Sequence, residues 1–289
     1  MFIIKYKHWF IALSVVLVVA SFAAMGVYGI KQGVDFTGGT TLEVLYGTST
    51  VPTLDVAAIK AINVDTYQTG DASFKFITTE AYDDVSPKLI PLLTQNGAYT
   101  FTPTTLTTVG PTLGKEMTHK ALIAIVIVIL AILAFIAFAF REVSRPVSSW
   151  KYGVAAMVTM AHDIIVPTGA YVLFSHFYGA ELNTLFVIAL LTIMAVTISD
   201  KIVVFDRIRE NLKVKKGSFE EIIGMSLRQT VVRSINTSLT TTLSLIALYI
   251  FGPESTRFFA LTLITGLVVG TYSSICVASP LLTYFHRNK

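Results

Sequence analysis

Six stretches of the chain consist almost entirely of apolar residues and are separated by polar segments. A helix needs about twenty predominantly apolar residues to cross the hydrocarbon core of a bilayer, which is about 30 Å thick. The six stretches that meet this standard are Phe10–Tyr28, Ala121–Phe140, Tyr152–Phe174, Asn183–Phe205, Ile235–Phe251 and Phe258–Leu282. The pattern therefore predicts an all-α membrane protein, a bundle of six transmembrane helices with its first span in residues 1–30 and the other five in 121–289.

The polar segment 31–120, between the first two apolar stretches, has the pattern of a small α+β domain. Its periodicity predicts a strand, a helix, two strands, a helix and a strand. The ranges assigned are Val34–Tyr46 for the first strand, Thr53–Ile62 for a helix with Thr53 as N-cap, Ser73–Thr79 for a strand, Val85–Gln95 for a helix that stops near Gly97, and Ala98–Val109 for the last strand. A βαββαβ order predicts a ferredoxin-like fold for this segment.

A second polar segment, Arg207–Arg228, is charged and has helical periodicity. Ser218 is followed three residues later by Glu221, the spacing of a capping box at the start of a helix. We predict an amphipathic segment that lies along the inner face of the membrane.

Composition supports a membrane protein and excludes several kinds of site. Hydrophobic residues make up 53% of the 289 residues and charged residues 14%, against about a quarter charged in a typical soluble domain. Cys276 is the only cysteine, so neither a disulfide within the chain nor a cysteine-based metal site is expected. The net charge of +4 requires no nucleic-acid partner, because the basic residues sort by membrane side.

Basic residues predict the orientation. With the N-terminus inside, fifteen of the 22 Lys and Arg residues fall on the inner side, so the positive-inside rule places both termini in the cytoplasm and the segment 31–120 outside. The first stretch follows Lys5 and Lys7 and ends in small residues, as a signal peptide does. Its apolar run exceeds the usual 7–15 residues of a cleaved signal, which favours a retained signal anchor.

Two carboxylates lie within the predicted spans. Asp163 is in the third span, beside His162 and four residues before Pro167; Asp200 is in the inner half of the fourth. A charge at the bilayer centre costs roughly 2.5–3.5 kcal/mol on insertion scales, so such residues usually face a protein interior or a water-filled path. Both are candidates for a proton relay.

Each carboxylate also has a plain structural interpretation. Asp163 could belong to a polar network that holds a proline kink, and Asp200 could be a helix-end residue paired with a basic neighbour such as Lys201 or Arg233. Lys201 could also extend to the inner surface. In the fifth span, hydroxyl residues favour ordinary helix packing, whereas Asn236 is predicted to face the carboxylates. Gly266 and Gly270 in the sixth span form a GxxxG pattern, a weak indication of close helix contact.

Six blocks along the chain carry a family resemblance. They are Gly33-Val34-Asp35-Phe36-Thr37-Gly38-Gly39-Thr40, Val109-Gly110-Pro111 with Gly114-Lys115-Glu116, Ala161-His162-Asp163, the run Val203–Asn211, and Arg233-Ser234-Ile235-Asn236-Thr237-Ser238, with Gly270-Thr271-Tyr272-Ser273-Ser274 closing the sixth span. In this order and topology they resemble the bacterial SecF family of protein-export membrane proteins.

The resemblance implies half of a resistance-nodulation-division type membrane assembly in the bacterial cytoplasmic membrane. It implies SecD, the SecYEG translocon, a translocating preprotein and membrane lipid as partners, with protons as the coupling ion and no other cofactor. Asp200 and Arg233 match family positions implicated in proton conduction, and Asp163, His162 and Asn236 are implied to line the same region. Asp35, Gly38 and Gly39 belong to the family's motif in the outer domain. The resemblance implies a transport subunit and not an enzyme.

One position departs from the family. Many members have Asn-Asp-Thr where this chain has Ser199-Asp200-Lys201, so Lys201 could hold Asp200 ionised. Three other functions stay open. A solute or lipid exporter of the same superfamily would commonly have larger outer domains, an intramembrane aspartyl protease would be expected to show a Gly-x-Gly-Asp motif, and a purely structural translocon subunit would need none of these acids.

Overall fold

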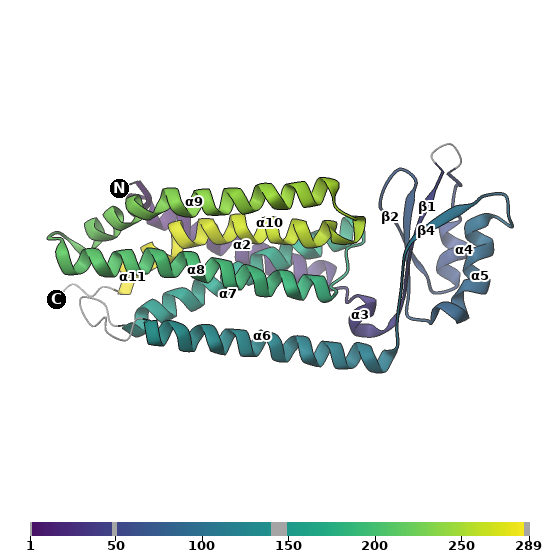
Figure 1. Cartoon of the computed structure of the whole chain (residues 1–289), viewed down its shortest axis with the longest axis horizontal. Coiled ribbons are helices and arrows are strands. Elements are labelled where there is room, and N and C mark those ends of the chain that lie inside the picture. Colours follow the sequence, from purple (N-terminus) through teal and green to yellow (C-terminus); the bar gives the residue numbers. More distant parts are fainter. Residues whose placement is uncertain (1, 48–50, 140–148, 286–289) are drawn as a thin grey trace. The chain divides into compact units, whose positions relative to one another are not determined.

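The computed structural model describes residues 2–47, 51–139 and 149–285 of the chain. It divides into two compact units (Figure 1). The bundle unit comprises residues 1–29, 125–171 and 188–289, and the sheet unit comprises residues 30–124 and 172–187. Three long helices continue from one unit into the other, so the end of each one belongs to the sheet unit.

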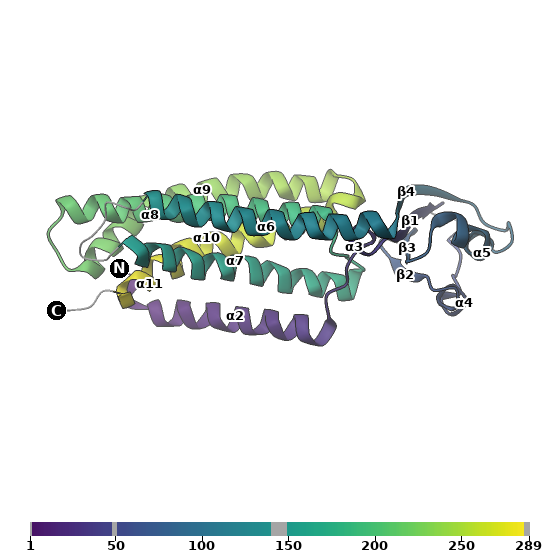
Figure 2. The same cartoon turned by 90° about the horizontal axis from the view of Figure 1, so that it is seen from below.

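Long apolar helices build the bundle unit, with α2, α7, α8, α9 and α10 running beside one another (Figure 2). The helices are α1 (Phe2–Lys5), α2 (Lys7–Tyr28), α6 (Pro111–Ala139), α7 (Ser149–Tyr178), α8 (Thr184–Val214), α9 (Phe219–Phe251), the 3₁₀ turn η1 (Glu254–Thr256), α10 (Arg257–Ser273), the π turn η2 (Ser274–Ala278) and α11 (Ser279–Phe285). Within the described ranges, six helical spans are long and apolar enough to cross a membrane. Each of the six predicted spans overlaps one of them; the predicted end of the second, Phe140, lies outside the described residues.

The sixth span contains a π turn, which the hydrophobic pattern did not reveal. Pro280 is the second residue of α11 and has no N–H with which to continue the helical hydrogen bonds. The wider π turn Ser274–Ala278 precedes it. Such turns within α-helices are frequent at functional sites, and this one follows directly on the polar residues of α10 described below.

The charged stretch 207–228 is divided between two long helices, since α8 continues to Val214 and α9 begins at Phe219. The capping box is present: the Ser218 side chain accepts a hydrogen bond from the Glu221 N–H, and the Glu221 carboxylate accepts one from the Ser218 N–H. Asn211 Nδ2 donates to Ser226 Oγ at 2.9 Å and to Gln229 Oε1 at 2.9 Å. These bonds hold the end of α8 against the start of α9.

The sheet unit contains a four-stranded antiparallel sheet with strand order β2-β3-β1-β4. Its strands are β1 (Gly39–Tyr46), β2 (Asp65–Gln68), β3 (Ser73–Thr78) and β4 (Phe101–Val109), and its helices are α3 (Val34–Thr37), α4 (Val56–Ala61) and α5 (Tyr82–Thr94). Helices α4 and α5 lie on one face of the sheet (Figures 1 and 2). Their core includes Leu42, Val44, Tyr46, Ile59, Phe76, Val85, Leu89 and Leu93. From β1 to β4 the order of strands and helices is the predicted one.

Two local predictions for this unit were wrong. The predicted first strand begins only at Gly39, because Val34–Thr37 forms the short helix α3. The N-cap of α4 is Asp55 and not Thr53, since the Asp55 carboxylate accepts a hydrogen bond from the Ala58 N–H at 3.0 Å. The predicted end of the second helix is confirmed: α5 ends at Thr94, and its C-cap Gln95 has a φ of 48°, in the left-handed region.

Tyr46 offers a test of the core of the sheet unit. Its side chain is 1% exposed, its hydroxyl donates to the Leu93 carbonyl at 2.9 Å, and burial raises the pKa of Tyr46 to about 12. We expect Tyr46→Phe to lower the free energy of unfolding of this unit by about 1–2 kcal/mol, because the buried Leu93 carbonyl loses its donor. The measurement is denaturant unfolding of the detergent-solubilised chain.

The raised pKa of Tyr46 predicts that the stability of the sheet unit depends on pH. A folded pKa above the ordinary value of 10 means that this contribution to stability is complete below pH 10 and is lost as pH rises through about 12. Tyr46→Phe should therefore lose less stability than the wild type over that range. Tyr99→Phe, which trims a partly buried ring packed on the same core, is the control; an equal effect of both substitutions would contradict the assignment.

Candidate functional site

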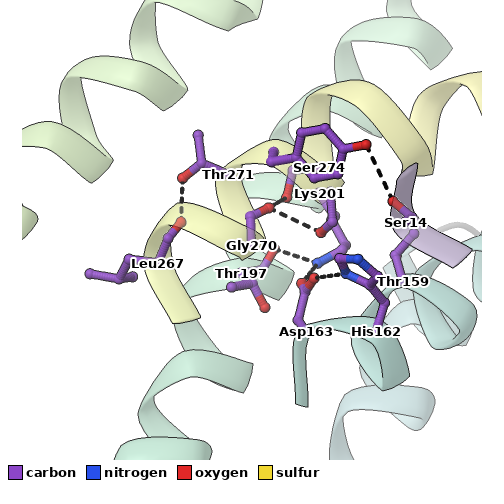
Figure 3. A network of polar contacts seen from close by, with 12 residues as sticks. Ser14, Thr159, His162, Asp163, Thr197, Lys201, Leu267, Gly270, Thr271 and Ser274 are labelled. Atoms are coloured by element: carbon purple, nitrogen blue, oxygen red, sulfur yellow. Dashed lines mark hydrogen bonds and ion pairs between the residues drawn. The ribbon is translucent and has the colours of Figure 1, made fainter. Parts of the chain in front are cut away.

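The centre of the bundle unit contains a fully buried pair of opposite charges. Asp163 lies on α7 and Lys201 on α8, and both residues are 0% exposed. Lys201 Nζ donates to Asp163 Oδ2 at 2.5 Å (Figure 3). The Lys201 ammonium also lies 3.4 Å from the Thr197 carbonyl, one turn earlier on α8. The ion pair is thus made between the third and fourth spans of the chain.

His162 lies against the other oxygen of the carboxylate. Its Nδ1 is 3.1 Å from Asp163 Oδ1, and the residue is 5% exposed. With a proton on Nδ1 the ring donates to the carboxylate, which then accepts from both His162 and Lys201. The Nε2 atom of His162 is buried and has no hydrogen-bond partner among the residues that the structure describes.

The end of helix α10 and the start of the π turn η2 border the site on a third side. The Ser274 hydroxyl donates to the Gly270 carbonyl at 2.7 Å, and the Ser273 hydroxyl donates to the same carbonyl at 3.1 Å. Ser273 is also near enough to interact with the Asp163 carboxylate. A Cβ on Gly270 would collide with the Thr197 side chain and lie 3.6 Å from Asp163 Oδ2, so glycine lets α10 approach both α7 and α8. The predicted close contact at Gly266 and Gly270 is confirmed, with α8 as the partner helix.

Helix α2 is linked to the site by hydrogen bonds to Tyr272 of α10. The Tyr272 hydroxyl donates to the Phe10 carbonyl at 2.6 Å and accepts from Ser14 Oγ at 3.4 Å. The Tyr272 and His162 rings lie 6.4 Å apart between centroids. Polar contacts around Asp163 therefore involve α2, α7, α8 and α10 (Figure 3).

The structure brings Asp163 and His162 together, but it places the other predicted proton-path residues outside this cluster. Asp200 is partly buried and is in no ion pair with any residue of the described ranges, although Lys201 and Arg233 interact with it electrostatically. Arg233 and Asn236 are both exposed on α9. Asn236 therefore does not face Asp163 within this chain.

Lys201 was expected to pair with Asp200 or to extend to the inner surface. Its ammonium interacts with Asp200 only electrostatically, and its ion-pair partner is Asp163. Lys201 is fully buried and bonded to Asp163. The reason is helical geometry: consecutive residues point about 100° apart, so Asp200 and Lys201 point in different directions. Opposite charges within a membrane usually pair, and that rule could have identified Lys201 as the partner of Asp163. Nothing in the pattern identified the contributions of Thr197 and Ser273.

The residues Asp35, Gly38 and Gly39 lie in the sheet unit, at the junction of α3 and β1. Asp35 Oδ2 accepts a hydrogen bond from the Thr184 N–H at 2.9 Å. Gly38 and Gly39 have φ of 79° and 124°, values in the left-handed region that side chains rarely adopt. Among the described residues, no group of three or more His, Cys, Asp or Glu side chains could hold a metal ion.

Six apolar spans with a charged pair buried between them define a multi-pass membrane protein. The family model described as "Protein export membrane protein SecD/SecF, C-terminal" matches residues 89–288, and the model described as "SecD/SecF GG Motif" matches residues 23–50. The chain belongs to the SecD/SecF family of protein-export membrane proteins.

Within that family the chain is similar to SecF over nearly its whole length. It is 36% identical to protein translocase subunit SecF of Thermobaculum terrenum, over 97% of this chain and 92% of that protein. It is 35% identical to the SecF of Anaerolinea thermophila, over 98% and 93%. The crystal structure of SecDF from Thermus thermophilus, a translocon-associated membrane protein, has a TM-score of 0.82 and 30% identity, covering 97% of this chain and 38% of that one. The chain thus spans about two fifths of the SecDF chain.

Proposed function

We propose that this chain is the SecF half of a proton-coupled export complex in the bacterial cytoplasmic membrane. It would pair with a SecD-like half, associate with the SecYEG channel and use proton flow to assist the late steps of preprotein translocation and release. Its similarity to proteins named SecF and to part of the SecDF chain supports the pairing. Both termini would be cytoplasmic and the sheet unit outside, and the strand order of that unit supports a ferredoxin-like fold.

The proposal that the chain is coupled to protons rests on the buried Asp163–Lys201 ion pair. Ionisable residues within membrane spans are costly to bury and usually mark ion or proton paths. Two buried polar atoms beside the pair, His162 Nε2 and Thr197 Oγ1, have no partner among the described residues. Buried polar atoms nearly always have partners, so both atoms are positions for a bound water molecule, and His162 Nε2 is also a base that can accept a proton.

The membrane potential supplies enough energy for such a site to act. One proton that crosses 100 mV releases about 2.3 kcal/mol. Since every 1.4 kcal/mol is a tenfold change in an equilibrium constant, this shifts a two-state conformational equilibrium by roughly fiftyfold. One proton per cycle can therefore bias a conformational change of the bundle.

The exposed polar face of α9 is where the SecD-like half would pack. Arg233, Asn236, Thr237, Thr240 and Thr241 are all exposed on this helix. A cation and an amide facing lipid would be costly, whereas helix–helix interfaces in membranes are enriched in such small and polar residues. On this proposal, Asp200 and Arg233 complete their proton path at the interface between the two halves.

The proposal predicts the effect of Asp200→Asn. Proton-gradient-dependent release of a preprotein from membrane vesicles should fall to the level measured without a gradient, because a neutral amide cannot carry a proton. Expression and co-purification with the SecD-like half should stay unchanged. Ser199→Ala, at the exposed neighbouring position, is the matched control and should release as the wild type does.

Two outcomes would contradict parts of the proposal. Unchanged release by Asp200→Asn would remove Asp200 from the coupling path and leave the Asp163–Lys201 pair as the candidate. Wild-type release that is independent of the gradient would favour a purely structural subunit.

A further inference from the structure

The segment Lys31–Gly39, which we call the GG joint, contacts three different parts of the sheet unit. It leads into β1, it packs against the start of α6, and it bonds to the loop between α7 and α8 and to the first turn of α8. All of these contacts lie within the sheet unit. The joint is therefore the place where the sheet and the ends of two membrane helices meet.

Main-chain hydrogen bonds attach the joint to the α7–α8 loop. The Gly33 N–H donates to the Leu182 carbonyl at 2.7 Å, and the Leu182 N–H donates to the Lys31 carbonyl at 3.0 Å. Gln32 and Leu182 form a parallel β-bridge. A Cβ on Gly33 would lie 3.0 Å from the Leu182 carbonyl oxygen, so glycine allows this close approach of the two backbones.

Asp35 caps the start of α8 from a distant part of the sequence. Its Oδ2 accepts the Thr184 N–H at 2.9 Å, across a separation of 149 residues. The first four N–H groups of a helix have no partner within the helix, and a negative charge there is favoured by the helix dipole. The Asn183 side chain accepts the Phe186 N–H at 3.0 Å, so Asp35 satisfies a different donor.

The joint packs closely against α6 because Gly114 has no side chain. A Cβ on Gly114 would lie 2.8 Å from the Gly38 nitrogen and 2.9 Å from the Phe36 carbonyl oxygen, both of them backbone atoms. The Thr118 hydroxyl, one turn further along α6, donates to the same Phe36 carbonyl at 3.4 Å. Backbone lies on backbone at this contact, which leaves little room for relative movement.

Side chains of the sheet hold the same loop from a second direction. Lys75 Nζ on β3 lies 3.5 Å from Glu181 Oε2 in the α7–α8 loop, and the two side chains are 13% and 12% exposed. Lys31 Nζ donates to the Tyr67 hydroxyl of β2 at 2.8 Å. The joint and the loop are thus both fixed to the sheet.

We propose that the GG joint is a rigid coupling element, and that Asp35 is a positioning residue that fixes the first turn of α8 to the sheet. Helix α8 is continuous from Thr184 to Val214. It carries Asp200 and Lys201 about four turns after the Asp35 contact. A displacement of α8 that accompanies proton transfer is therefore passed to the sheet through Asp35 and the Gly33–Leu182 bonds. This inference rests on the proposed proton-coupled function.

The first test compares Asp35→Ala with Asp35→Asn in the intact complex with its SecD-like partner. Loss of an N-cap costs about 1 kcal/mol, so Asp35→Ala should speed hydrogen exchange of the amides at the start of α8 about fivefold. It should also lower gradient-dependent preprotein release while leaving release without a gradient unchanged. Asparagine retains an acceptor oxygen, so Asp35→Asn should restore most of both properties.

The matched control is Asp55→Ala. It removes an N-cap of the same kind from α4, in the same unit, and should leave gradient-dependent release unchanged. If Asp35→Ala alters exchange but not release, or if it leaves exchange unaltered, the positioning role is overturned. If the wild type shows no gradient-dependent release, the proposed function fails, and the exchange result still decides whether Asp35 fixes the start of α8.

A second test asks whether the joint stays closed. Gln32 and Leu182 are bridge partners, so their Cα atoms are near enough for a disulfide. In a Cys276→Ala background, oxidation of Gln32→Cys/Leu182→Cys should leave gradient-dependent release unchanged if the joint is rigid. Loss of release on oxidation, recovered with a reductant, would show that this contact must open and would overturn the rigid joint.

Discussion

Replacing Lys201 by methionine is expected to destabilise the bundle unit by about 3–5 kcal/mol. The Asp163 carboxylate is 0% exposed and its partner ammonium is equally buried, so the substitution leaves a buried negative charge without its cation. His162 remains as a partner of the other carboxylate oxygen, but it compensates the charge only when it is protonated. The measurement is denaturant unfolding of the detergent-solubilised chain, together with its yield in the membrane.

A double substitution separates stability from function at this pair. In Asp163→Asn/Lys201→Met both charges are absent, and the amide still offers His162 a hydrogen-bond partner. Replacing both members of a buried ion pair is often neutral or even stabilising, so we expect most of the lost stability to return. Gradient-dependent preprotein release should nevertheless be absent in this double variant, because no titratable carboxylate remains on α7 at this site.

Three results would count against this account. A Lys201→Met variant as stable as the wild type would show that the pair is not a buried charge pair. A double variant with full gradient-dependent release would show that the pair is only structural. A double-mutant cycle without coupling between the two positions would contradict the contact itself.

The six spans could be predicted because their signal is local. About twenty consecutive apolar residues suffice to indicate a membrane helix, and each predicted stretch overlaps one in the structure. Their ends could not be predicted. Helices α6 and α8 extend well beyond their apolar parts, and the π turn of the last span, just before Pro280, leaves no sign in the apolar pattern.

The site could be predicted only in part. Asp163 and His162 are adjacent in sequence, and the polarity of both stands out in an apolar span. Which residue of α8 pairs with Asp163 depends on how α8 is rotated about its axis relative to α7. Asp200 and Lys201 are adjacent in sequence, yet Lys201 is bonded to Asp163 and Asp200 is not. The bond from Thr184 to Asp35 likewise depends on tertiary packing and leaves no trace in local pattern.

The glycines of the outer motif are a further case in which the sequence did not predict a tertiary contact. Sequence resemblance indicated that Gly38 and Gly39 belong together, but not what each one does. In the structure Gly39 begins β1, where it pairs with Val109 of β4, with its backbone directly against that of β3. Only the three-dimensional contact shows why a side chain is excluded there.

Gly39→Ala is expected to be among the most damaging single substitutions in the sheet unit, with a loss of about 3 kcal/mol or more. Its φ of 124° is unfavourable for any side chain, and a Cβ there would collide with the Thr78 carbonyl oxygen and lie 2.8 Å from the Thr79 Cα. Both obstacles are backbone atoms of the neighbouring segment, so no side-chain rotation relieves the clash. Hydrogen exchange of the β1 and β3 amides in the full chain measures the effect.

Substitutions at two other glycines separate the two causes of this loss of stability, backbone strain and steric collision. Gly97→Ala introduces a side chain at φ of 95° with nothing within 4 Å, and Gly110→Ala introduces one with nothing within 4 Å and no such φ. We expect Gly110→Ala to be nearly neutral and Gly97→Ala to cost about 1 kcal/mol from backbone strain alone. If Gly39→Ala costs no more than Gly97→Ala, backbone strain accounts for the whole effect, and the contact of β1 with the Thr78–Thr79 backbone leaves room for a Cβ. A clearly larger cost at Gly39 would mean that the close approach of the two strands is what requires glycine in the motif.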